Sequence, residues 1–137
     1  IDSKQIIFEM TETAASNANN IVADSLRTLG EHGVCFALDD YGTGYANIDT
    51  VIRLPFSIIK LDKSMVRAYF QNPKNALIFR DTVKMMHDLG IQTLAEGVET
   101  KQQLDEMLRL GVDYIQGYYF ARPMPIEDLL KFIDNPA

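Results

Sequence analysis

The chain has 137 residues, of which 47% are hydrophobic and 23% charged, a balance typical of a folded globular domain and not of a disordered or low-complexity segment. Its formal net charge is −6 at pH 7 and its basic residues are scattered, which argues against binding of duplex nucleic acid through a basic surface. No apolar run approaches the roughly 18 residues of a membrane span, and a single cysteine, Cys35, excludes a disulfide framework and favours a reducing, cytosolic setting.

Predicted strands and helices alternate along the first half of the chain. Val22, Leu26 and Leu29 recur at helical spacing, and short apolar runs rich in β-forming residues lie on either side of them. The pattern predicts, in order, a strand over residues 5–10, a helix over 17–32, a strand over 34–38, a polar glycine loop over 39–44, a helix over 46–53 and a strand over 56–61.

The second half continues the same alternation. A helix is predicted over 75–89, with Gly90 in the position of a left-handed cap. The elements that follow are a strand over 91–95, a helix opened by a capping box at Thr100 and Gln103, a strand over 113–117, and a last helix with Pro125 in its first turn. This alternation indicates an α/β fold in which about five parallel strands are flanked by helices.

Polar residues end every predicted strand, and they are Glu9, Asp39 with Asp40, Lys60, Glu96 and Gln116. In a parallel α/β fold the carboxyl ends of the strands share one face, where barrel and doubly wound enzymes keep their active sites. Side chains alternate along a strand, so Glu9 points away from Phe8, and Lys60 away from Ile59 and Leu61. If those apolar residues face the helices, Glu9 and Lys60 face the barrel axis.

Four carboxylates converging with one ammonium would repel one another unless something binds them. Mg²⁺ and Mn²⁺ prefer carboxylate oxygens, and the adjacent pair of Asp39 and Asp40 is suited to holding two ions. Two such ions are a device for phosphodiester hydrolysis, in which Lys60 can position the attacking water or stabilise developing charge.

Each of these residues also has an ordinary structural interpretation, which the residues alone leave open. An acidic residue at a strand end is often a helix cap, the segment 39–44 is a common kind of turn, and Lys60 could lie on the surface. His32 and His87 lie near predicted helix ends, where they fit partners of the helix dipole. Cys35 fits a buried apolar position better than a nucleophile.

Five motifs together resemble the EAL-domain family, in that family's order and spacing and over essentially the whole chain. They are Glu9-Met10-Thr11-Glu12, Asp39-Asp40-Tyr41-Gly42-Thr43-Gly44-Tyr45, Leu54-Pro55 with Lys60-Leu61-Asp62, Ala95-Glu96-Gly97-Val98-Glu99 and Gln116-Gly117-Tyr118. The resemblance implies a partial TIM-like (β/α) barrel. It also implies hydrolysis of cyclic di-GMP to linear pGpG, with Mg²⁺ or Mn²⁺, in bacterial second-messenger signalling.

The resemblance further implies a role for each matching residue. The matched metal ligands are Glu9, Asp39, Asp40 and Glu96, with Asp39 bridging two ions. Lys60 matches the lysine beside the attacking water, and Gln116 a glutamine that lines the same site. Glu12 matches a glutamate that braces the loop of Gly42, Thr43 and Gly44, which in the family couples dimerisation to catalysis. Glu99 resembles a residue that lies behind the ligands.

Several features depart from the family pattern. Tyr41 stands where Phe is usual, Ala46 and Asn47 where small Ser residues are common, and Ser57 where Asp is often seen. The family's Glu-Ala-Leu strand, with a metal-binding Glu and a substrate-contacting Arg, and a further Asn ligand are not in this sequence. We therefore expect them upstream of Ile1, with residues 1–137 forming the C-terminal part of a single EAL domain, since a complete barrel has about 250 residues.

A partial barrel has consequences for activity and assembly. The fragment alone is expected to show weak or no activity, because metal ligands are missing. Its open sheet edges favour a homodimer, with swapped elements as one form of it. An upstream GGDEF or sensor domain and a cytoplasmic location follow from the resemblance.

Two other functions remain as alternatives. A degenerate EAL module would bind cyclic di-GMP or a protein partner without cleaving anything. An unrelated metal-dependent barrel enzyme, such as a lyase, would share the carboxylates but not the full set of motifs.

Overall fold

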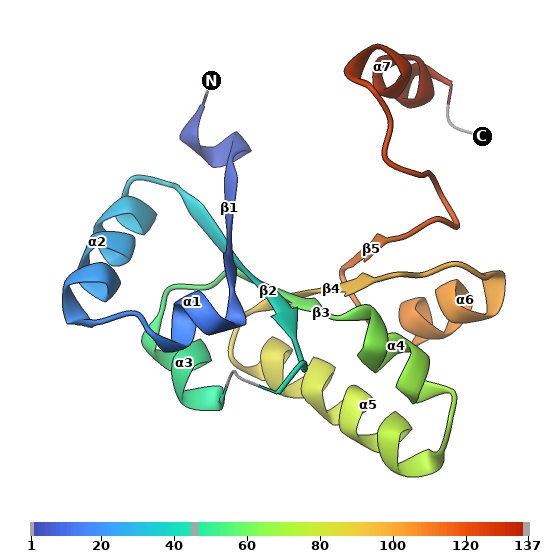
Figure 1. The fold of residues 1–137 in the computed structure, drawn as a ribbon, viewed down its shortest axis with the longest axis horizontal. Coiled ribbons are helices and arrows are strands. Elements are labelled where there is room, and N and C mark those ends of the chain that lie inside the picture. The colour runs from blue at the N-terminus through green and yellow to red at the C-terminus, as the bar shows by residue number, and fades with distance from the viewer. Residues whose placement is uncertain (1, 45–46, 136–137) are drawn as a thin grey trace.

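The fold is built on a sheet of parallel strands that follow one another in chain order (Figure 1). The computed structural model describes residues 2–44 and 47–135. Within these ranges five strands pair in parallel in the order β1-β2-β3-β4-β5. The strands are β1 (Ile7–Thr11), β2 (Cys35–Tyr41), β3 (Ile58–Leu61), β4 (Gln92–Glu96) and β5 (Tyr114–Gln116). The predicted α/β fold is thereby confirmed.

Helices connect successive strands. After a 3-10 turn η1 (Ser3–Gln5), they are α1 (Glu12–Ser16), α2 (Asn20–Glu31), α3 (Ile48–Arg53), α4 (Lys63–Tyr69), α5 (Pro73–Asp88), α6 (Lys101–Arg109) and α7 (Ile126–Asp134). The predicted capping box opens α6, where the Thr100 side chain accepts from the Gln103 N–H and Gln103 accepts from the Thr100 N–H. Gly90 follows α5 with a φ of 75°, as predicted for a left-handed cap.

Two short helices are absent from the sequence prediction. α1 and α4 have no long apolar stripe, and each begins at a capping side chain, Thr11 for α1 and Asp62 for α4. Arg53 also holds the end of α1 from a distance, since its Nη2 donates to Ala15 O in the last turn at 3.3 Å and its Nη1 to Ala18 O, just after the helix, at 2.6 Å. Such caps and long-range bonds do not show as a periodic pattern.

Some predicted boundaries also differ. The polar loop predicted over 39–44 starts later, because residues 39–41 belong to β2. With α1 in front of it, the helix predicted from residue 17 begins at Asn20. Pro125 is the N-cap of α7, not part of its first turn. The helix predicted over 46–53 corresponds to α3, with residue 46 outside the described ranges.

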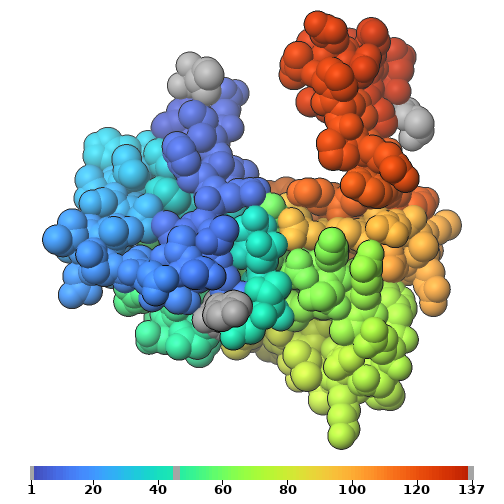
Figure 2. Space-filling model, viewed as in Figure 1, coloured from blue at the N-terminus to red at the C-terminus, as the bar shows by residue number. Residues whose placement is uncertain are grey.

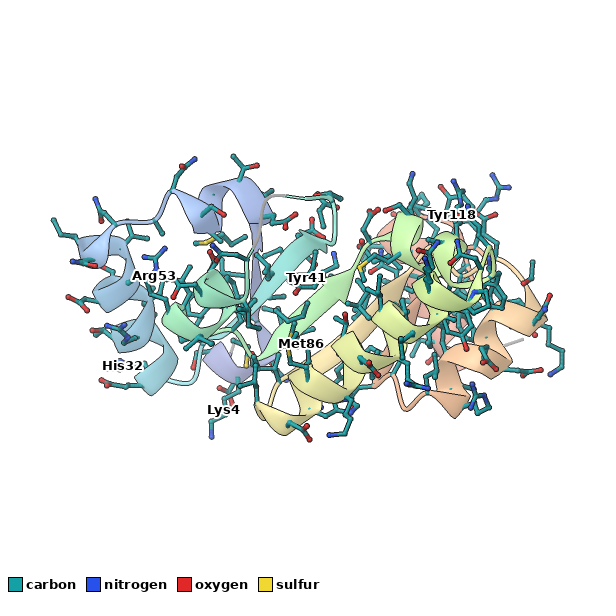
Figure 3. All side chains as sticks on the ribbon, turned by 90° about the horizontal axis from the view of Figure 1, so that it is seen from below. Lys4, His32, Tyr41, Arg53, Met86 and Tyr118 are labelled. Atoms are coloured by element: carbon teal, nitrogen blue, oxygen red, sulfur yellow. The ribbon has the colours of Figure 1, made fainter. Side chains whose placement is uncertain are left out.

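The two faces of the sheet have different partners. Alternate residues of the central strands, Phe36, Leu38, Ile59 and Leu61, are buried in one core. The helices contribute to that core with Ala23, Val51, Val66, Phe79, Val83, Met86 and Met107. Met86 on α5 is labelled among the side chains in Figure 3. The alternate position Lys60 therefore lies on the opposite face. Phe8 approaches Phe36 with ring centroids 6.1 Å apart. Because it lies on the edge strand β1, it is nevertheless 54% exposed and is not the buried core residue that strand alternation predicts.

Apolar surface remains at both ends of the sheet. Within the described ranges β1 and β5 are its edges, and Ile7 on β1 is 51% exposed. α7 stands away from the rest of the molecule (Figures 1 and 2), and its apolar residues Ile126, Leu129, Leu130 and Ile133 are exposed. None of the helices in the described part of the chain is long and apolar enough to cross a membrane.

Asp113 ties the loop before β5 to the start of β4 and the end of α5. Its Oδ2 accepts hydrogen bonds from the Thr93 N–H at 2.8 Å and the Thr93 hydroxyl at 3.2 Å, and lies 2.8 Å from His87 Nε2. Burial alone would raise the pKa of this carboxyl, but the bonds from Thr93 and His87 lower it below its usual value. His87, expected near the helix dipole, thus has a specific carboxylate partner.

We expect Asp113→Ala to lower the free energy of unfolding by about 1–3 kcal/mol at pH 7, because the buried Thr93 N–H loses its acceptor. Since the folded-state pKa of Asp113 is lowered, its contribution is present above the unfolded-state value of about 4 and should fade as the pH falls below it. Urea unfolding at several pH values measures both effects. The control Asp105→Ala removes an exposed pair with Lys101 and should change the stability very little. Equal losses of stability in the two variants would contradict the stabilising role of Asp113.

Candidate active site

The ammonium of Lys60 joins the carboxyl ends of neighbouring strands. Its Nζ lies 2.8 Å from Glu9 Oε1 on β1, 3.1 Å from Asp39 Oδ1 on β2 and 3.1 Å from Glu96 Oε1 on β4. The Lys60 side chain is only 7% exposed, so a buried cation faces three carboxylates. The convergence predicted from strand alternation is therefore present in the structure.

The local charges perturb one another. Burial alone would lower the pKa of Lys60, but its close contacts with the carboxylates of Glu9, Glu96 and Asp39 raise it above its usual value, so the side chain stays cationic. Burial raises the pKa of Glu96 despite the nearby Lys60, and burial and the charge of Asp39 raise that of Asp40. Ionising these two carboxyls therefore costs free energy, which an added cation would relieve.

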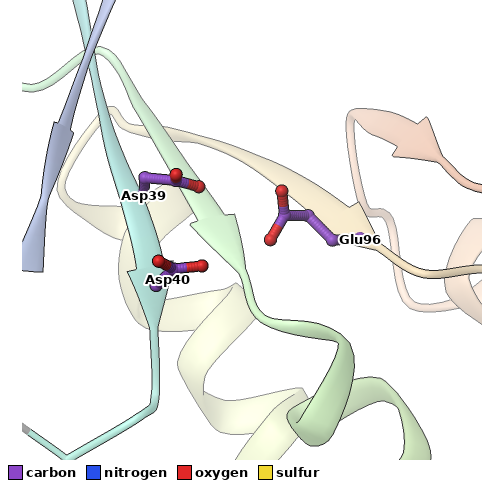
Figure 4. Close-up of side chains that lie close together, drawn as sticks. All are labelled: Asp39, Asp40 and Glu96. Atoms are coloured by element: carbon purple, nitrogen blue, oxygen red, sulfur yellow. The ribbon is translucent and has the colours of Figure 1, made fainter. Parts of the chain in front are cut away.

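An irregularity in β2 turns two adjacent aspartates toward the same space (Figure 4). The register between β2 and β3 shifts after Leu38, so that β2 carries one extra residue opposite Lys60. Asp40 in this bulge has a φ of 59°, in the left-handed region that non-glycine residues rarely adopt. Regular alternation would send Asp39 and Asp40 to opposite faces, but oxygen atoms of both lie within 4.8 Å of each other and of Glu96.

This arrangement fits a divalent cation. Asp39 Oδ1 is fully buried and accepts no hydrogen bond from any residue in the described ranges, so its contact with Lys60 is ionic. Carboxylate oxygens are the ligands that hard divalent cations prefer, and those of Asp39, Asp40 and Glu96 are close enough to share one. Glu9 is joined to the group through Lys60.

A cavity of about 550 Å³ opens beside these carboxylates. Asp40 and Glu96 line one part of it, and Gln116 stands next to Glu96 in the β4–β5 register. The turn after Gln116 packs tightly, because a Cβ on Gly117 would lie 2.0 Å from Val98 O. Gly117 thus lets the backbone after β5 approach β4 and form the wall of the cavity.

A second contact holds the loop after β2. The Thr43 hydroxyl donates to Glu12 Oε2 at 2.7 Å, and Glu12 is only 2% exposed. Gly42 has a φ of 100°, and a Cβ there would lie 2.1 Å from Met65 Sδ, so the position requires glycine. Gly44 also has a positive φ of 112°. The geometry agrees with the expected bracing of this loop by Glu12; Tyr45 lies outside the described residues.

Other singled-out residues lie apart from the carboxylates. Glu99 Oε1 is 3.8 Å from Arg67 Nη2 on α4, at the surface. His32 Nδ1 lies 2.8 Å from the Thr28 carbonyl oxygen at the end of α2. The structure thus places Glu99 in a surface pair and His32 in a helix-terminal contact.

The cavity also contains residues to which sequence reasoning gave no role. Asp62, Lys63, Tyr118 and Arg122 line it. Asp62 and Tyr118 belong to the EAL-like motifs, so their presence in the site could have been predicted from those motifs. Arg122 belongs to none of the motifs, and its place in the cavity depends on how the chain turns after β5.

The comparisons with known proteins identify relatives of this fold and site. A family model described as EAL domain matches residues 1–123. Cyclic di-GMP phosphodiesterase RocR of Pseudomonas aeruginosa is 36% identical over 127 residues. Among solved structures, Pseudomonas aeruginosa MucR phosphodiesterase in a c-di-GMP complex matches with a TM-score of 0.85 and 33% identity. The manganese and cy-diGMP complex of Klebsiella pneumoniae BlrP1 matches with a TM-score of 0.81 and 31% identity.

These relatives are longer than the chain. The matches cover 93% of this chain and 32% of RocR, 94% and 52% for MucR, and 90% and 31% for BlrP1. The chain therefore corresponds to only a part of each relative.

The cluster around Lys60 predicts a specific stability effect. Lys60→Met should lower the free energy of unfolding by about 3–5 kcal/mol, because it leaves buried carboxylates without their cation. Adding Mn²⁺ should recover part of the loss, since a cation that binds only the folded state stabilises it. Denaturant unfolding with and without Mn²⁺ measures both quantities.

The matched control is Lys84→Met, which removes an exposed lysine paired with Asp88 at 2.6 Å and should lower the stability far less, because exposed ion pairs contribute little. If Lys60→Met lowers the free energy of unfolding no more than this control does, the proposed contribution of Lys60 and its carboxylates to stability is contradicted.

Proposed function

Because this chain belongs to the EAL domain family, we propose that it forms part of a domain that hydrolyses cyclic di-GMP to linear pGpG in bacterial second-messenger signalling. The observation that carries the proposal is the cluster at the strand ends, where three carboxylates meet the buried ammonium of Lys60. The names of RocR and MucR as phosphodiesterases, and the c-di-GMP in the MucR complex, support the choice of substrate.

We assign the binding of divalent cations to the carboxylates. In the proposal Asp39, Asp40 and Glu96, with Glu9, hold two ions, and Mg²⁺ or Mn²⁺ is the resident metal. The buried Asp39 oxygen that accepts no hydrogen bond in the described part of the chain supports this assignment, as do the carboxylate oxygens within 4.8 Å of one another and the manganese named for BlrP1. Such ions, when bound, activate water and neutralise phosphate charge.

Lys60 acts as a fixed cation and not as a base. Beside the carboxylates its pKa is raised, which keeps the proton on Nζ, so the side chain can donate hydrogen bonds. The ammonium holds the carboxylates together and stabilises negative charge that develops on the phosphate. Gln116, beside Glu96 on the cavity wall, has both a donor and an acceptor with which to orient a water molecule or the substrate.

Glu12 positions the loop that follows Asp39 and Asp40. Its bond with Thr43 fixes that loop against α1, directly after the strand that carries Glu9. A change in α1 would thereby be transmitted to both aspartates, which supports a coupling between assembly and activity through this contact.

We further propose that residues 1–137 are the C-terminal part of a single EAL domain, whose other strands cover the edges at β1 and β5. The half-exposed Ile7 and Phe8 support this, as does the fraction of each relative that the chain matches. In this view the chain alone has weak activity, and a second copy covers the edges in a homodimer, with element swapping as one form. An upstream GGDEF or sensor domain and a cytoplasmic location complete the proposal.

Asp40→Asn in the full-length protein that carries this chain should reduce hydrolysis of cyclic di-GMP by about 100-fold or more, because it removes a charged metal ligand. Asparagine tolerates the left-handed backbone of Asp40, so the fold should persist. EDTA should abolish the wild-type activity and Mn²⁺ restore it, as measured by the appearance of pGpG. Mn²⁺ titration calorimetry should show weakened binding by the variant.

Asp105→Asn makes the same chemical change on the surface of α6 and should leave hydrolysis and Mn²⁺ binding unaltered. Cleavage that resists EDTA would contradict the metal-dependent reaction. Tight binding of cyclic di-GMP by the Mn²⁺-loaded wild type without cleavage would identify a non-catalytic module instead.

Thr43→Val tests the bracing of the loop. Removing the hydroxyl that donates to Glu12 should raise the Mn²⁺ concentration needed for half-maximal activity by about 10-fold, because Asp39 and Asp40 lose their fixed placement. Thr28→Val removes a hydroxyl bonded to the Asp24 carbonyl within α2 and should have no such effect. An unchanged Mn²⁺ requirement in Thr43→Val would refute the positioning role.

A further inference from the structure

The cavity beside the carboxylates is also lined by positively charged side chains. Tyr118 and Arg122, from the segment after β5, line it together with Asp62 and Lys63 at the start of α4. The Arg122 guanidinium carbon lies 4.8 Å from the centroid of the Tyr118 ring, a cation–π contact. Among the described residues Arg122 has no carboxylate partner. Arg122, without a carboxylate partner in the described part of the chain, therefore lines the same cavity as Asp40 and Glu96.

The charges of the site show what this arginine can do. Glu9, Asp39, Asp40 and Glu96 bring four negative charges and Lys60 one positive charge. Two divalent cations would offset these carboxylates and leave enough positive charge for about one phosphodiester. Cyclic di-GMP carries a second phosphodiester, which lies across the ring from the first and needs a cation outside the metal centre.

Arg122 has the geometry for that role. A guanidinium stacked on an aromatic ring keeps its edge free, and that edge presents parallel N–H donors that match two phosphate oxygens. The Tyr118 ring also restricts the side chain before any ligand arrives, which reduces the entropy lost on binding. An isolated lysine at this place would offer only a point charge.

We propose that Arg122, held by Tyr118, binds the phosphodiester of cyclic di-GMP that is not cleaved. This inference rests on the proposed function, because it takes its ligand from there. It gives the charged groups of the cavity separate tasks: the carboxylates serve the reacting phosphate, and Arg122 anchors the other one. Arg122 then contributes to substrate affinity and leaves metal binding unchanged.

The test is calorimetric binding of cyclic di-GMP to the full-length protein in Ca²⁺, used as a divalent ion that slows turnover. Arg122→Ala should raise the Kd by about 10- to 100-fold, as expected for a lost charge-assisted pair of hydrogen bonds. Arg122→Lys, which keeps the charge but not the fork, should give an intermediate value. The dependence of Kd on salt should become shallower in Arg122→Ala, because one phosphate contact is gone. The Mn²⁺ affinity should not change.

Arg67→Ala removes one positive charge from the surface of α4 and serves as the control, expected to bind like the wild type. Tyr118→Ala provides a second variant if Arg122→Ala does not fold, and should raise the Kd by about 3- to 10-fold through the lost cation–π contact.

The outcomes separate the two proposals. Unchanged affinity in both Arg122→Ala and Tyr118→Ala, with binding by the wild type intact, overturns this inference and leaves the proposed function standing. An unchanged salt dependence, or an equal loss in Arg67→Ala, also overturns the assignment to a phosphate. Failure of the metal-loaded wild type to bind cyclic di-GMP overturns the proposed function itself, and this inference with it.

Discussion

The buried ammonium of Lys60 is the contact on which the arrangement of the strand ends depends. Parallel pairing brings the carboxyl ends of β1 to β4 to one edge, and three of those ends carry acidic side chains. Without a cation among them, the carboxylates of Glu9, Asp39 and Glu96 would repel one another in a partly buried space. Because β3 is the middle strand, its lysine reaches partners on both sides, and the same residue therefore organises the fold and the site.

The cavity is lined by charges of both signs. The carboxylates of Asp40 and Glu96 suit metal ions, whereas Arg122 brings positive charge to the same cavity. A net negative protein can in this way provide a place for an anionic nucleotide, because the charge that matters is local. The overall charge of −6 is thus compatible with a phosphate-bearing ligand while still disfavouring duplex nucleic acid.

Much of this arrangement can be predicted from the sequence, and there is a physical reason why the rest cannot. Strand alternation predicts that Lys60 lies on the face opposite Ile59 and Leu61, which is the face predicted for Glu9, and the structure places the two side chains in contact there. Strand alternation does not predict the direction of the Asp40 side chain, because Asp40 lies in a bulge. The bulge arises from the pairing of β2 with β3 and cannot be recognised from the residues of β2 alone. α1 and α4 are missed because caps and distant bonds, such as that from Arg53, define them.

The left-handed backbone at Asp40 narrows the residues that this position accepts. Glycine and asparagine fit the backbone but supply no negative charge, and glutamate supplies the charge but resists the conformation. Aspartate meets both demands. A single nucleotide change that turns Asp40 into asparagine would therefore spare the fold and remove a proposed metal ligand, so one mutation would be enough to produce an inactive domain with the same fold.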